Sequence, residues 1–417
     1  MLFTILPLIM LTPLKANNAG YVTDSIVVRM FQYVFPKATE NVLVDSACTL
    51  TSFFNQLKAL KNDHSSVVSI CHVGDSHIQA DIQTGITRRM FQDFFGNAGR
   101  GLIVPLKLAK TNEPKNYRIT STQKWEAFRC IKPGDYPVGI GGMVLVSHDS
   151  ISSVKIETLD LYNPNKWNFN DFTVFYDTSL VSLRITDSIP ISYDPNGETA
   201  FTRQFKTDTL INNVNLTWEK EGNNPIRFYG INLRNGQSGV LYHAIGINGA
   251  HYEEYAVSPE FMQQISALTP SLIIISMGIN EAYDKGFNPD IFYNSIDKTI
   301  KQIRNQCPDA VFLLTTPAET WYMFRSSKQR KPHPNIIKAR NTIIKYAKKH
   351  QLAYWDLFSI TGGKGSAFTW KKHKLLQKDG VHFTQDGYEL IGELFFEAIY
   401  NSYKTNPENN HELNSDN

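Results

Sequence analysis

The sequence predicts an α/β fold: a parallel sheet flanked by helices and interrupted by an inserted all-β sandwich. Three observations lead to this prediction. The 417 residues exceed the usual size of a single domain. Apolar runs alternate with amphipathic stretches over residues 66–95 and again from 237 onward, as in parallel sheets connected by helices. Between them, residues 106–235 show short alternating runs separated by turn-rich segments, which is typical of β-sandwiches.

The N-terminus has the pattern of a secretory signal. An apolar stretch from Leu2 to Leu14 is too short to span a membrane, and small residues follow at Ala16 and Ala19, where cleavage could occur. No Lys or Arg precedes this stretch, so a membrane-anchored or cytosolic N-terminus stays open as the alternative to export. No other segment is long and apolar enough to cross a bilayer. The expected division of the chain is a signal peptide over 1–19, a first α/β part over 20–105, a β insertion over 106–235, a second α/β part over 236–404 and a disordered tail over 405–417.

The first α/β part contains a strand, a tight turn and a helix. The strand is predicted for "SVVSICHVGD", and Ser76 lies on the turn that follows it. Beyond the turn, apolar residues recur at intervals of four, which predicts one amphipathic helix with Gly96 as its C-cap. The residues of this stripe are Ile78, Ile82, Ile86, Met90 and Phe94.

The insertion and the second α/β part differ in their patterns. Within the insertion, the aromatic residues Trp125, Trp167, Phe169 and Trp218 either fill a sandwich core, which is the commoner role, or stack on sugar rings. In the second α/β part, strands are predicted for "SLIIISMG", "AVFLLTTP" and "LAYWDLF". Helices are predicted for "DIFYNSIDKTIKQIRNQ", "NIIKARNTIIKYAKKH" and "GYELIGELFFEAIYNSY".

Composition excludes several classes of function. A formal net charge of +3 is small for this length and gives no support for nucleic-acid binding. The four cysteines are scattered without a CxxC pair, which argues against a zinc site and against a disulfide framework. Cys71 lies within an apolar run and is interpreted as a small core residue.

Four short stretches follow predicted strands or lie in the loops beyond them: "GDSH" (74–77), "GINGAH" (246–251), "MGINEA" (277–282) and "KDGVHFT" (378–384). In open α/β sheets, ligands bind at the carboxyl ends of the strands, so these stretches are expected to meet at one edge. Together they supply the groups that acyl transfer needs.

Each group has a candidate role in this chemistry. Ser76 is the candidate nucleophile and His382 the candidate general base, with Asp379 three residues earlier to fix the imidazole tautomer. The backbone N–H groups of Ser76 and Gly249 and the side-chain amide of Asn280 are candidate oxyanion-hole donors. Taken singly, each residue has a simpler interpretation as a turn or cap residue. Their occurrence in this order, each near the end of a strand, favours the catalytic interpretation.

The ordered blocks resemble those of the SGNH (GDSL-type) hydrolases. In that family a serine and an Asp-x-x-His pair form the catalytic triad, and glycine and asparagine complete the oxyanion hole. The resemblance therefore implies a triad of Ser76, Asp379 and His382. It also implies that Gly249 and Asn280 contribute the remaining oxyanion donors.

A narrower resemblance is to the peptidoglycan O-acetylesterases, in which a carbohydrate-binding-module-like β domain is inserted into the SGNH fold. It is carried by "HVGDSHIQADIQTGITRRMFQDFFGNAGRGLIVP", "GINGA", "GINEA" and "KDGVHFTQDGY". Glu281 stands where the general SGNH pattern has Asp, in agreement with the narrower family. Asp75 and His77 are assigned supporting roles, because the triad already has its Asp and its His.

This resemblance implies an exported esterase of the periplasm or cell envelope. Its reaction would be hydrolysis of the acetyl ester on the C6 hydroxyl of N-acetylmuramoyl residues, through an acetyl-serine intermediate and without a metal or organic cofactor. The expected partner is an O-acetylated glycan, in the first place peptidoglycan, with no nucleic acid and no stable membrane insertion after signal removal. The alternatives are an acetylesterase acting on another polysaccharide or a lipid, a catalytically inactive glycan-binding protein, and an O-acetyltransferase.

Overall fold

The computed structural model describes residues 41–406, apart from 161–162, 164–165, 180, 188 and 325–328. The predicted signal peptide lies outside the described residues, as does the predicted tail from residue 407 onward. Within the described part of the chain, no helix combines the length and the apolar character needed to cross a membrane.

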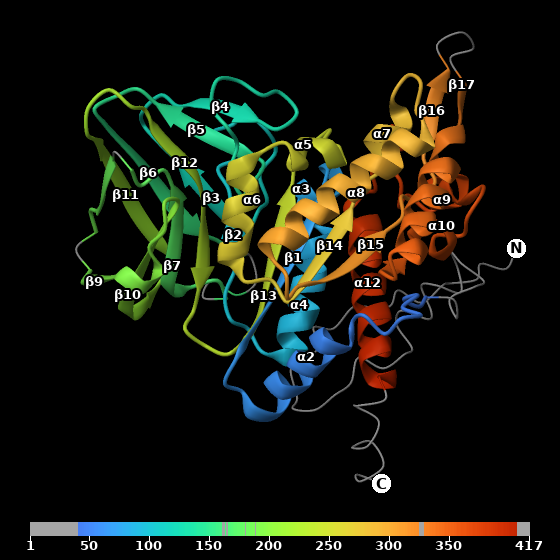
Figure 1. Ribbon diagram of the computed structural model, residues 1–417, viewed down its shortest axis with the longest axis horizontal. Helices are drawn as coiled ribbons and strands as arrows, with labels where there is room; N and C mark the ends of the chain where they lie inside the picture. Colours follow the sequence, from blue (N-terminus) through green and yellow to red (C-terminus); the bar gives the residue numbers. More distant parts are fainter. Residues whose placement is uncertain are drawn as a thin grey trace, which may run out of the picture.

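A five-stranded parallel sheet forms the centre of the α/β part, as predicted (Figure 1). Its strand order is β13-β1-β14-β15-β18, and every neighbouring pair is parallel. The predicted apolar runs become these strands because each is buried on both faces of the sheet. The strands are β1 (Val67–Gly74), β13 (Gly239–Gly246), β14 (Leu272–Ser276), β15 (Val311–Thr315) and β18 (Ala353–Trp355).

Helices cover both faces of this sheet. Alternate residues of a strand point to opposite faces, so Ile70 and Ile274 belong to one apolar cluster and Cys71 and Ile273 to another. The first cluster includes side chains of α2 (Thr51–Asp63), α4 (Gln83–Phe95) and α12 (Gln385–Thr405). The second includes side chains of α5 (Tyr252–Ala256), α6 (Pro259–Ile265), α8 (Pro289–Gln306) and α9 (Pro334–Lys349). The remaining short helices are α3 (Ser76–Gln79), α7 (Ile279–Tyr283), α10 (Leu357–Ile360) and α11 (Ser366–Lys372).

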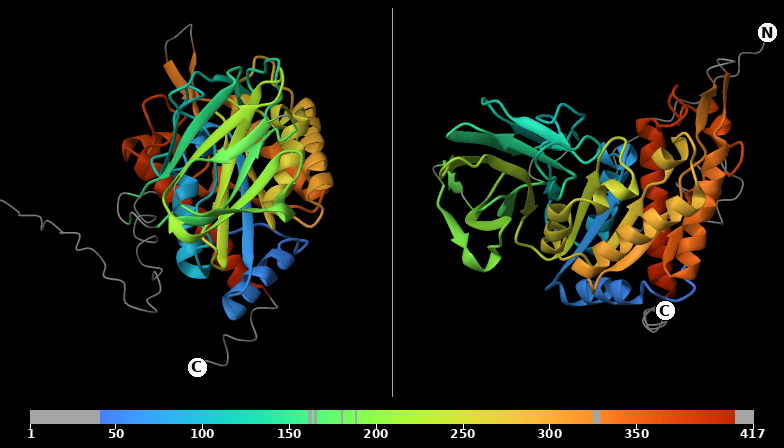
Figure 2. Two further views of the ribbon diagram at one scale, coloured as in Figure 1. Left: turned by 90° about the vertical axis from the view of Figure 1, so that its left-hand side faces the viewer. Right: turned by 45° about the horizontal axis from the view of Figure 1, so that its top comes forward.

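Two antiparallel sheets lie between β1 and β13 in the sequence and at one side of the molecule in space (Figures 1 and 2). One has the order β4-β5-β12-β7-β10-β9, with β2 also paired to β12, and the other has the order β3-β6-β11-β8. The sheets contact each other through Trp218 of β11, whose ring lies 5.0 Å from Phe228 of β12 and 6.1 Å from Tyr176 of β7. Their strands are β2 (Gly101–Ile103), β3 (Tyr117–Thr120), β4 (Glu126–Arg129), β5 (Met143–Ser147), β6 (Ile151–Thr158), β7 (Phe169–Tyr176), β8 (Val181–Ile185), β9 (Ile191–Asp194), β10 (Thr202–Ile211), β11 (Asn213–Lys220) and β12 (Ile226–Arg234). Strand β2 thus lies just before the expected boundary at residue 106.

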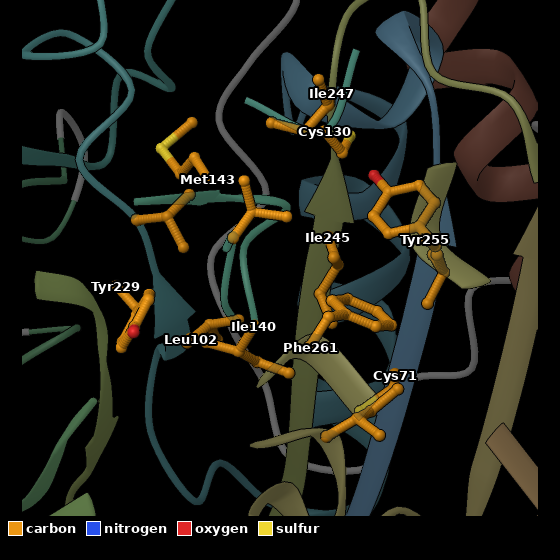
Figure 3. Packing of buried hydrophobic residues seen from close by; sticks show 14 of the residues in the cluster. Cys71, Leu102, Cys130, Ile140, Met143, Tyr229, Ile245, Ile247, Tyr255 and Phe261 are labelled. Atoms are coloured by element: carbon orange, nitrogen blue, oxygen red, sulfur yellow. The ribbon is translucent and has the colours of Figure 1, made fainter. Parts of the chain in front are cut away.

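The antiparallel strands share a hydrophobic core with the parallel sheet. Figure 3 shows Cys71 and Ile245 of the parallel sheet in the same packed region as Leu102, Met143 and Tyr229 of the antiparallel strands. All five side chains belong to one continuous cluster and are at most 3% exposed. The two parts of the molecule are therefore joined by buried apolar surface as well as by the chain.

Of the four aromatic residues singled out in the insertion, Trp125, Phe169 and Trp218 belong to this core, and Trp167 is buried outside it. Trp167, Phe169 and Trp218 are no more than 3% exposed, and Trp125 is 8% exposed. Their rings are enclosed by protein on both faces, so the sugar-stacking alternative is wrong for these four side chains.

The helix predicted after Ser76 is interrupted. Helix α3 ends at Gln79, and α4 begins only at Gln83, because Asp81 between them adopts a left-handed conformation with φ of 53°. The predicted stripe is consequently rotated, and the buried face of α4 contains Arg88 and Phe91 instead of Ile86 and Met90. Gly96 caps the end of α4, as predicted, with its N–H donated to the carbonyl of Gln92.

A final element is a hairpin near the far edge of the parallel sheet. Strands β16 (Trp321–Phe324) and β17 (Gln329–Pro332) pair antiparallel and project from the body of the molecule (Figure 1). The backbone N–H of Trp321 donates to the carbonyl of Gly380 at 2.8 Å, so the hairpin holds the loop that contains Asp379 and His382.

Candidate active site

Ser76 is held directly above the end of β1 by a tight strand-to-helix turn. The carboxylate of Asp75 accepts the backbone N–H of His77 at 2.9 Å and thereby caps α3. Glycine is required where α3 crosses the strand ends, since a Cβ on Gly246 would lie 2.4 Å from the backbone nitrogen of Gln79. A Cβ on Gly74 would likewise lie 2.9 Å from the carbonyl oxygen of Ser276.

This turn stands at the point where the order of the parallel strands reverses. Along the chain, β13 adds to one side of β1, whereas β14, β15 and β18 add to the other. The register pairs Gly74 with both Gly246 and Ser276, so the carboxyl ends of the three strands lie side by side. Such a reversal leaves a crevice beyond the strand ends where α/β proteins bind ligands.

Ser76, His382 and Asp379 form a continuous chain of hydrogen bonds. The Oγ of Ser76 lies 2.9 Å from Nε2 of His382, and Nδ1 of His382 lies 2.8 Å from Oδ2 of Asp379. The other carboxylate oxygen of Asp379 accepts the backbone N–H groups of Val381 and His382 at 2.9 and 3.0 Å. The structure thus brings the hydroxyl of Ser76 to an imidazole and carboxylate pair that lies about 300 residues later in the sequence.

The ionised form of Asp379 is favoured by this loop. Partial burial acts to raise the pKa of Asp379. The N–H of Val381 and the imidazole and N–H of His382 outweigh that effect, and the pKa is held below its ordinary value. The carboxylate is therefore charged at neutral pH and accepts the Nδ1–H of His382, which leaves Nε2 free to accept a proton from Ser76.

His77 packs against the imidazole of His382. The two rings are stacked, with centroids 5.2 Å apart and planes inclined by 26°. The hydroxyl of Tyr388 lies 3.0 Å from Nδ1 of His77 and fixes the orientation of that ring. Burial, and secondly the charge of His382, lower the pKa of His77 to about 3, so this ring is neutral at the pH of catalysis. His77 therefore supports His382 without competing for its proton.

The remaining predicted donors lie on the other side of Ser76. The side-chain amide of Asn280 donates to the carbonyl of Ala250 at 2.9 Å and lies 3.3 Å from Oδ2 of Asp75. Gly249 precedes Ala250 in a tight turn and has φ of 85°, a conformation that favours glycine. Asn280 is thus hydrogen-bonded to both the residue before Ser76 and the residue after Gly249.

Asp75 is the most deeply buried carboxylate at this edge, with 1% of its surface exposed. Burial raises the pKa of Asp75 to about 6, although the N–H of His77 and the charge of His382 oppose the shift. Its two oxygens accept from His77 and Asn280, so Asp75 ties the serine turn to the asparagine.

Three further residues contribute to the site and were not singled out from the sequence. Gln79 accepts the backbone N–H of Asn248 at 2.7 Å, and Tyr388 positions His77. Tyr255 donates its hydroxyl proton to the carbonyl of Gly74 at 2.9 Å. Gln79 could have been noticed in the sequence, because it is a polar residue about one turn after Ser76 on an otherwise apolar face. Tyr388 and Tyr255 have no such signal, because their partners come from distant segments.

A family comparison matched part of the chain. Residues 191–395 match the family model described as GDSL-like lipase/acylhydrolase. That region contains Gly249, Asn280, Asp379 and His382, whereas Ser76 precedes it. A search of curated proteins found no match.

Solved structures show a similar fold. A peptidoglycan O-acetylesterase covers 87% of this chain and 99% of its own, with a TM-score of 0.70 and 19% identity. A GDSL-like lipase from Bacteroides thetaiotaomicron and an acetyl xylan esterase each align with 39% of this chain. Their TM-scores are 0.31 and 0.30, their identities 20% and 18%, and 76% and 81% of their own chains are covered. Because it covers 87% of the chain, the first of these similarities includes residues of both the α/β part and the antiparallel insertion.

Proposed function

Because the chain contains a GDSL-like lipase/acylhydrolase domain and is a serine hydrolase of the esterase type, we propose that it removes O-acetyl groups from the N-acetylmuramoyl residues of peptidoglycan. The observation that carries this proposal is the hydrogen-bonded chain from Ser76 through His382 to Asp379 at the reversal point of the sheet. The substrate is suggested by the similarity to a peptidoglycan O-acetylesterase, which covers 87% of the chain.

In the proposed mechanism, the acetyl group passes through a covalent intermediate on Ser76. The Oγ of Ser76 attacks the acetyl carbonyl carbon while Nε2 of His382 accepts the hydroxyl proton. The negative charge on the carbonyl oxygen meets the N–H groups of Ser76 and Gly249 and one N–H of the Asn280 amide, which turns from its longer contact, the 3.3 Å bond to Asp75, while its bond to Ala250 is kept. Collapse of the tetrahedral intermediate breaks the bond to the sugar oxygen, which leaves with the proton from His382.

Water then completes the reaction. His382 accepts a proton from the water molecule as it attacks acetyl-Ser76. The second tetrahedral intermediate then releases acetate as His382 returns this proton to the Oγ of Ser76. Asp379 stays ionised throughout and stabilises the imidazolium that forms in each half-reaction. Asp75 and His77 act through their contacts with Asn280 and His382.

The proposal extends to the organisation of the chain. We assign residues 106–235 to an inserted carbohydrate-binding-module-like domain, and residues 20–105 and 236–404 to the two parts of the hydrolase. Support comes from the two antiparallel sheets that lie between β1 and β13. Because peptidoglycan lies outside the cytoplasm, this function also requires export, for which the apolar N-terminus is the proposed signal.

The test is acetate release from O-acetylated peptidoglycan, with base-deacetylated peptidoglycan and the Ser76→Ala variant as controls. Release from the acetylated polymer alone, abolished in the variant, would support both the substrate and the nucleophile. Turnover of 4-nitrophenyl acetate without release from peptidoglycan would refute the substrate and retain the esterase. Absence of turnover with both substrates would refute the catalytic assignment and favour a glycan-binding protein.

A further inference from the structure

Glu281 is a buried carboxylate at the active-site edge to which the proposed mechanism gives no role. Only 8% of its surface is exposed. Its Oε1 accepts the backbone N–H of Tyr252 at 2.8 Å, while its Oε2 is buried without a hydrogen-bond partner among the described residues. A carboxylate in such a place is costly to fold, so its retention needs a reason beyond packing.

Its hydrogen bond reaches the turn that carries Gly249. This turn connects β13 to α5, and the N–H of Ala250 closes it by donating to the carbonyl of Ile247 at 3.0 Å. On one side of Gly249, the N–H of Asn248 donates to Gln79 at 2.7 Å. On the other side, the carbonyl of Ala250 accepts from Asn280 at 2.9 Å.

Glu281 therefore adds a second attachment beyond that of Asn280. The two residues are consecutive at the start of α7, and their side chains bind the chain at positions 250 and 252. Because both attachments come from one short helix, they fix the Gly249 turn relative to the Asn280 amide.

We infer that Glu281 is a positioning residue for the oxyanion hole, holding the N–H of Gly249 in register with the amide of Asn280. The inference rests on the proposed function, in which these two groups stabilise the same oxygen. Oxyanion donors act only when they already point at the developing charge, and a misplacement of about 1 Å costs about 100-fold in rate. Glu281 touches neither substrate nor reacting atoms in this role.

The length of the side chain matters as much as its acceptor oxygen. Aspartate at this position is shorter by one methylene and withdraws the carboxylate from the N–H of Tyr252. Glutamine keeps the length and offers a carbonyl oxygen to the same N–H. We can therefore separate the contribution of the hydrogen bond to Tyr252 from that of the negative charge by comparing Glu281→Asp, Glu281→Gln and Glu281→Ala.

A matched control exists at the same helix start. The carboxylate of Glu254 accepts the backbone N–H of His251 at 2.7 Å, one residue before Tyr252. This bond is local to α5. Glu254 also lies 3.4 Å from Nδ1 of His251, whose Nε2 lies 3.3 Å from Asp284 at the C-terminal end of α7, but Glu254 binds neither Ala250 nor Tyr252. Glu254→Ala thus removes an equivalent bond to the backbone without releasing the Gly249 turn from Asn280.

The experiment measures kcat and KM of the full chain with 4-nitrophenyl acetate, melting temperature, and affinity for a boronic acid that forms a tetrahedral adduct on the serine. We expect Glu281→Ala and Glu281→Asp to lower kcat about 100-fold and weaken the boronic acid similarly, with KM changed less than about threefold. Glu281→Gln should recover kcat to within about fivefold of the wild type, and Glu254→Ala should stay within about threefold.

Three results would overturn the inference: unchanged kcat in Glu281→Ala, a Glu281→Gln variant as slow as Glu281→Ala, or equal losses in Glu254→Ala. Failure of the proposed function is seen separately in the wild type. If the wild type fails to hydrolyse 4-nitrophenyl acetate, the esterase proposal is refuted. If it hydrolyses this ester but not acetylated peptidoglycan, only the proposed substrate is refuted. The comparison of the Glu281 variants then still tests whether Glu281 positions the oxyanion hole.

Discussion

Two buried carboxylates near Asn280, those of Asp75 and Glu281, have pKa values raised by burial. Burial raises the pKa of Glu281 from 4.5 to about 7, although the N–H of Tyr252 and the charge of His251 oppose the shift. A raised pKa means that folding favours the protonated form, so the associated stability is present below pH 4.5 and is lost as pH rises through 7.

The first prediction concerns Glu281→Gln, which removes this titration. The free energy of unfolding of the wild type should fall relative to that of the variant between pH 5 and pH 8, by at most about 3 kcal/mol. Urea unfolding at the two pH values measures the difference. A constant difference between the two proteins at both pH values would contradict the assigned pKa.

The second prediction concerns the ring stacked on His382. Tyr388→Phe removes the hydrogen bond to Nδ1 of His77, and His77→Ala removes the ring itself. A lost hydrogen bond of about 1 kcal/mol corresponds to a roughly fivefold reduction in kcat, and loss of the stacking ring should cost more, about 10- to 100-fold. Steady-state kinetics with a small acetyl ester measures both, and a His77→Ala variant as active as the wild type would show that His382 needs no such support.

At the scale of elements, the crossing of α3 over the strand ends is the most tightly constrained contact. The helix passes so close to β13 that a Cβ on Gly246 meets backbone atoms at 2.4 and 2.8 Å. Backbone atoms cannot move aside singly, so the whole of α3, including Ser76, must shift to make room.

The third prediction follows from this contact. Gly246→Ala should lower the free energy of unfolding by about 1–3 kcal/mol and reduce kcat, because the Ser76–His382 distance changes with α3. Gly85→Ala is the matched control, since a Cβ there meets nothing within 4 Å. That glycine lies inside α4, where alanine should stabilise by about 0.5–1 kcal/mol. Chemical denaturation and steady-state kinetics of both variants test this prediction. Equal free energies of unfolding and equal kcat values in the two variants would show that α3 is not constrained by its crossing over Gly246.

The elements also show what the sequence could and could not predict. The strands and long helices were predictable because their burial follows directly from apolar periodicity, as in "SLIIISMG" and the stripe of α8. The break at Asp81 was not predictable, because it occurs at a buried ion-pair cluster that apolar periodicity does not reveal. Asp81 binds Arg88 and Arg100, and the stripe of isoleucines gives no sign of this cluster.

The candidate site also contains residues that the sequence could predict and residues that it could not. Ser76, Gly249 and Asn280 lie in short polar stretches directly after β1, β13 and β14, so their meeting could be expected from the carboxyl ends of parallel strands. The expectation that Asp379 and His382 also follow a strand was wrong, because the loop that contains them comes after α11. Tyr388, which orients His77, could not be expected, because its contact is created only by the tertiary arrangement.

At the scale of the molecule, the Asp81 cluster joins the α/β part to the antiparallel sheets. Its carboxylate pairs with Arg88 of α4 at 2.7 Å and with Arg100, which directly precedes β2, at 2.6 Å. All three side chains are at most 1% exposed. Burial acts to raise the pKa of Asp81, but the two guanidinium groups outweigh it and hold the pKa well below its ordinary value.

The fourth prediction is that Asp81→Asn destabilises strongly. The variant keeps the shape of the side chain but leaves two buried cations without a counter-charge, which should cost about 3–5 kcal/mol. Glu157→Gln breaks the solvent-exposed pair with Lys155 and should cost less than about 1 kcal/mol. Urea unfolding near pH 7 compares the two, and a small effect of Asp81→Asn would show that the cluster contributes little to the junction.

The path of the chain through the two parts has a consequence for when activity can arise. Ser76 and His382 are separated by 306 residues, and β1 pairs with β13 only after both antiparallel sheets have been synthesised. Closing such long loops is slow and entropically costly, so the nucleophile and its base meet late in folding. A partly synthesised chain therefore carries Ser76 without His382. The hydrogen-bonded chain from Ser76 to Asp379 can form only when almost the whole sequence is present.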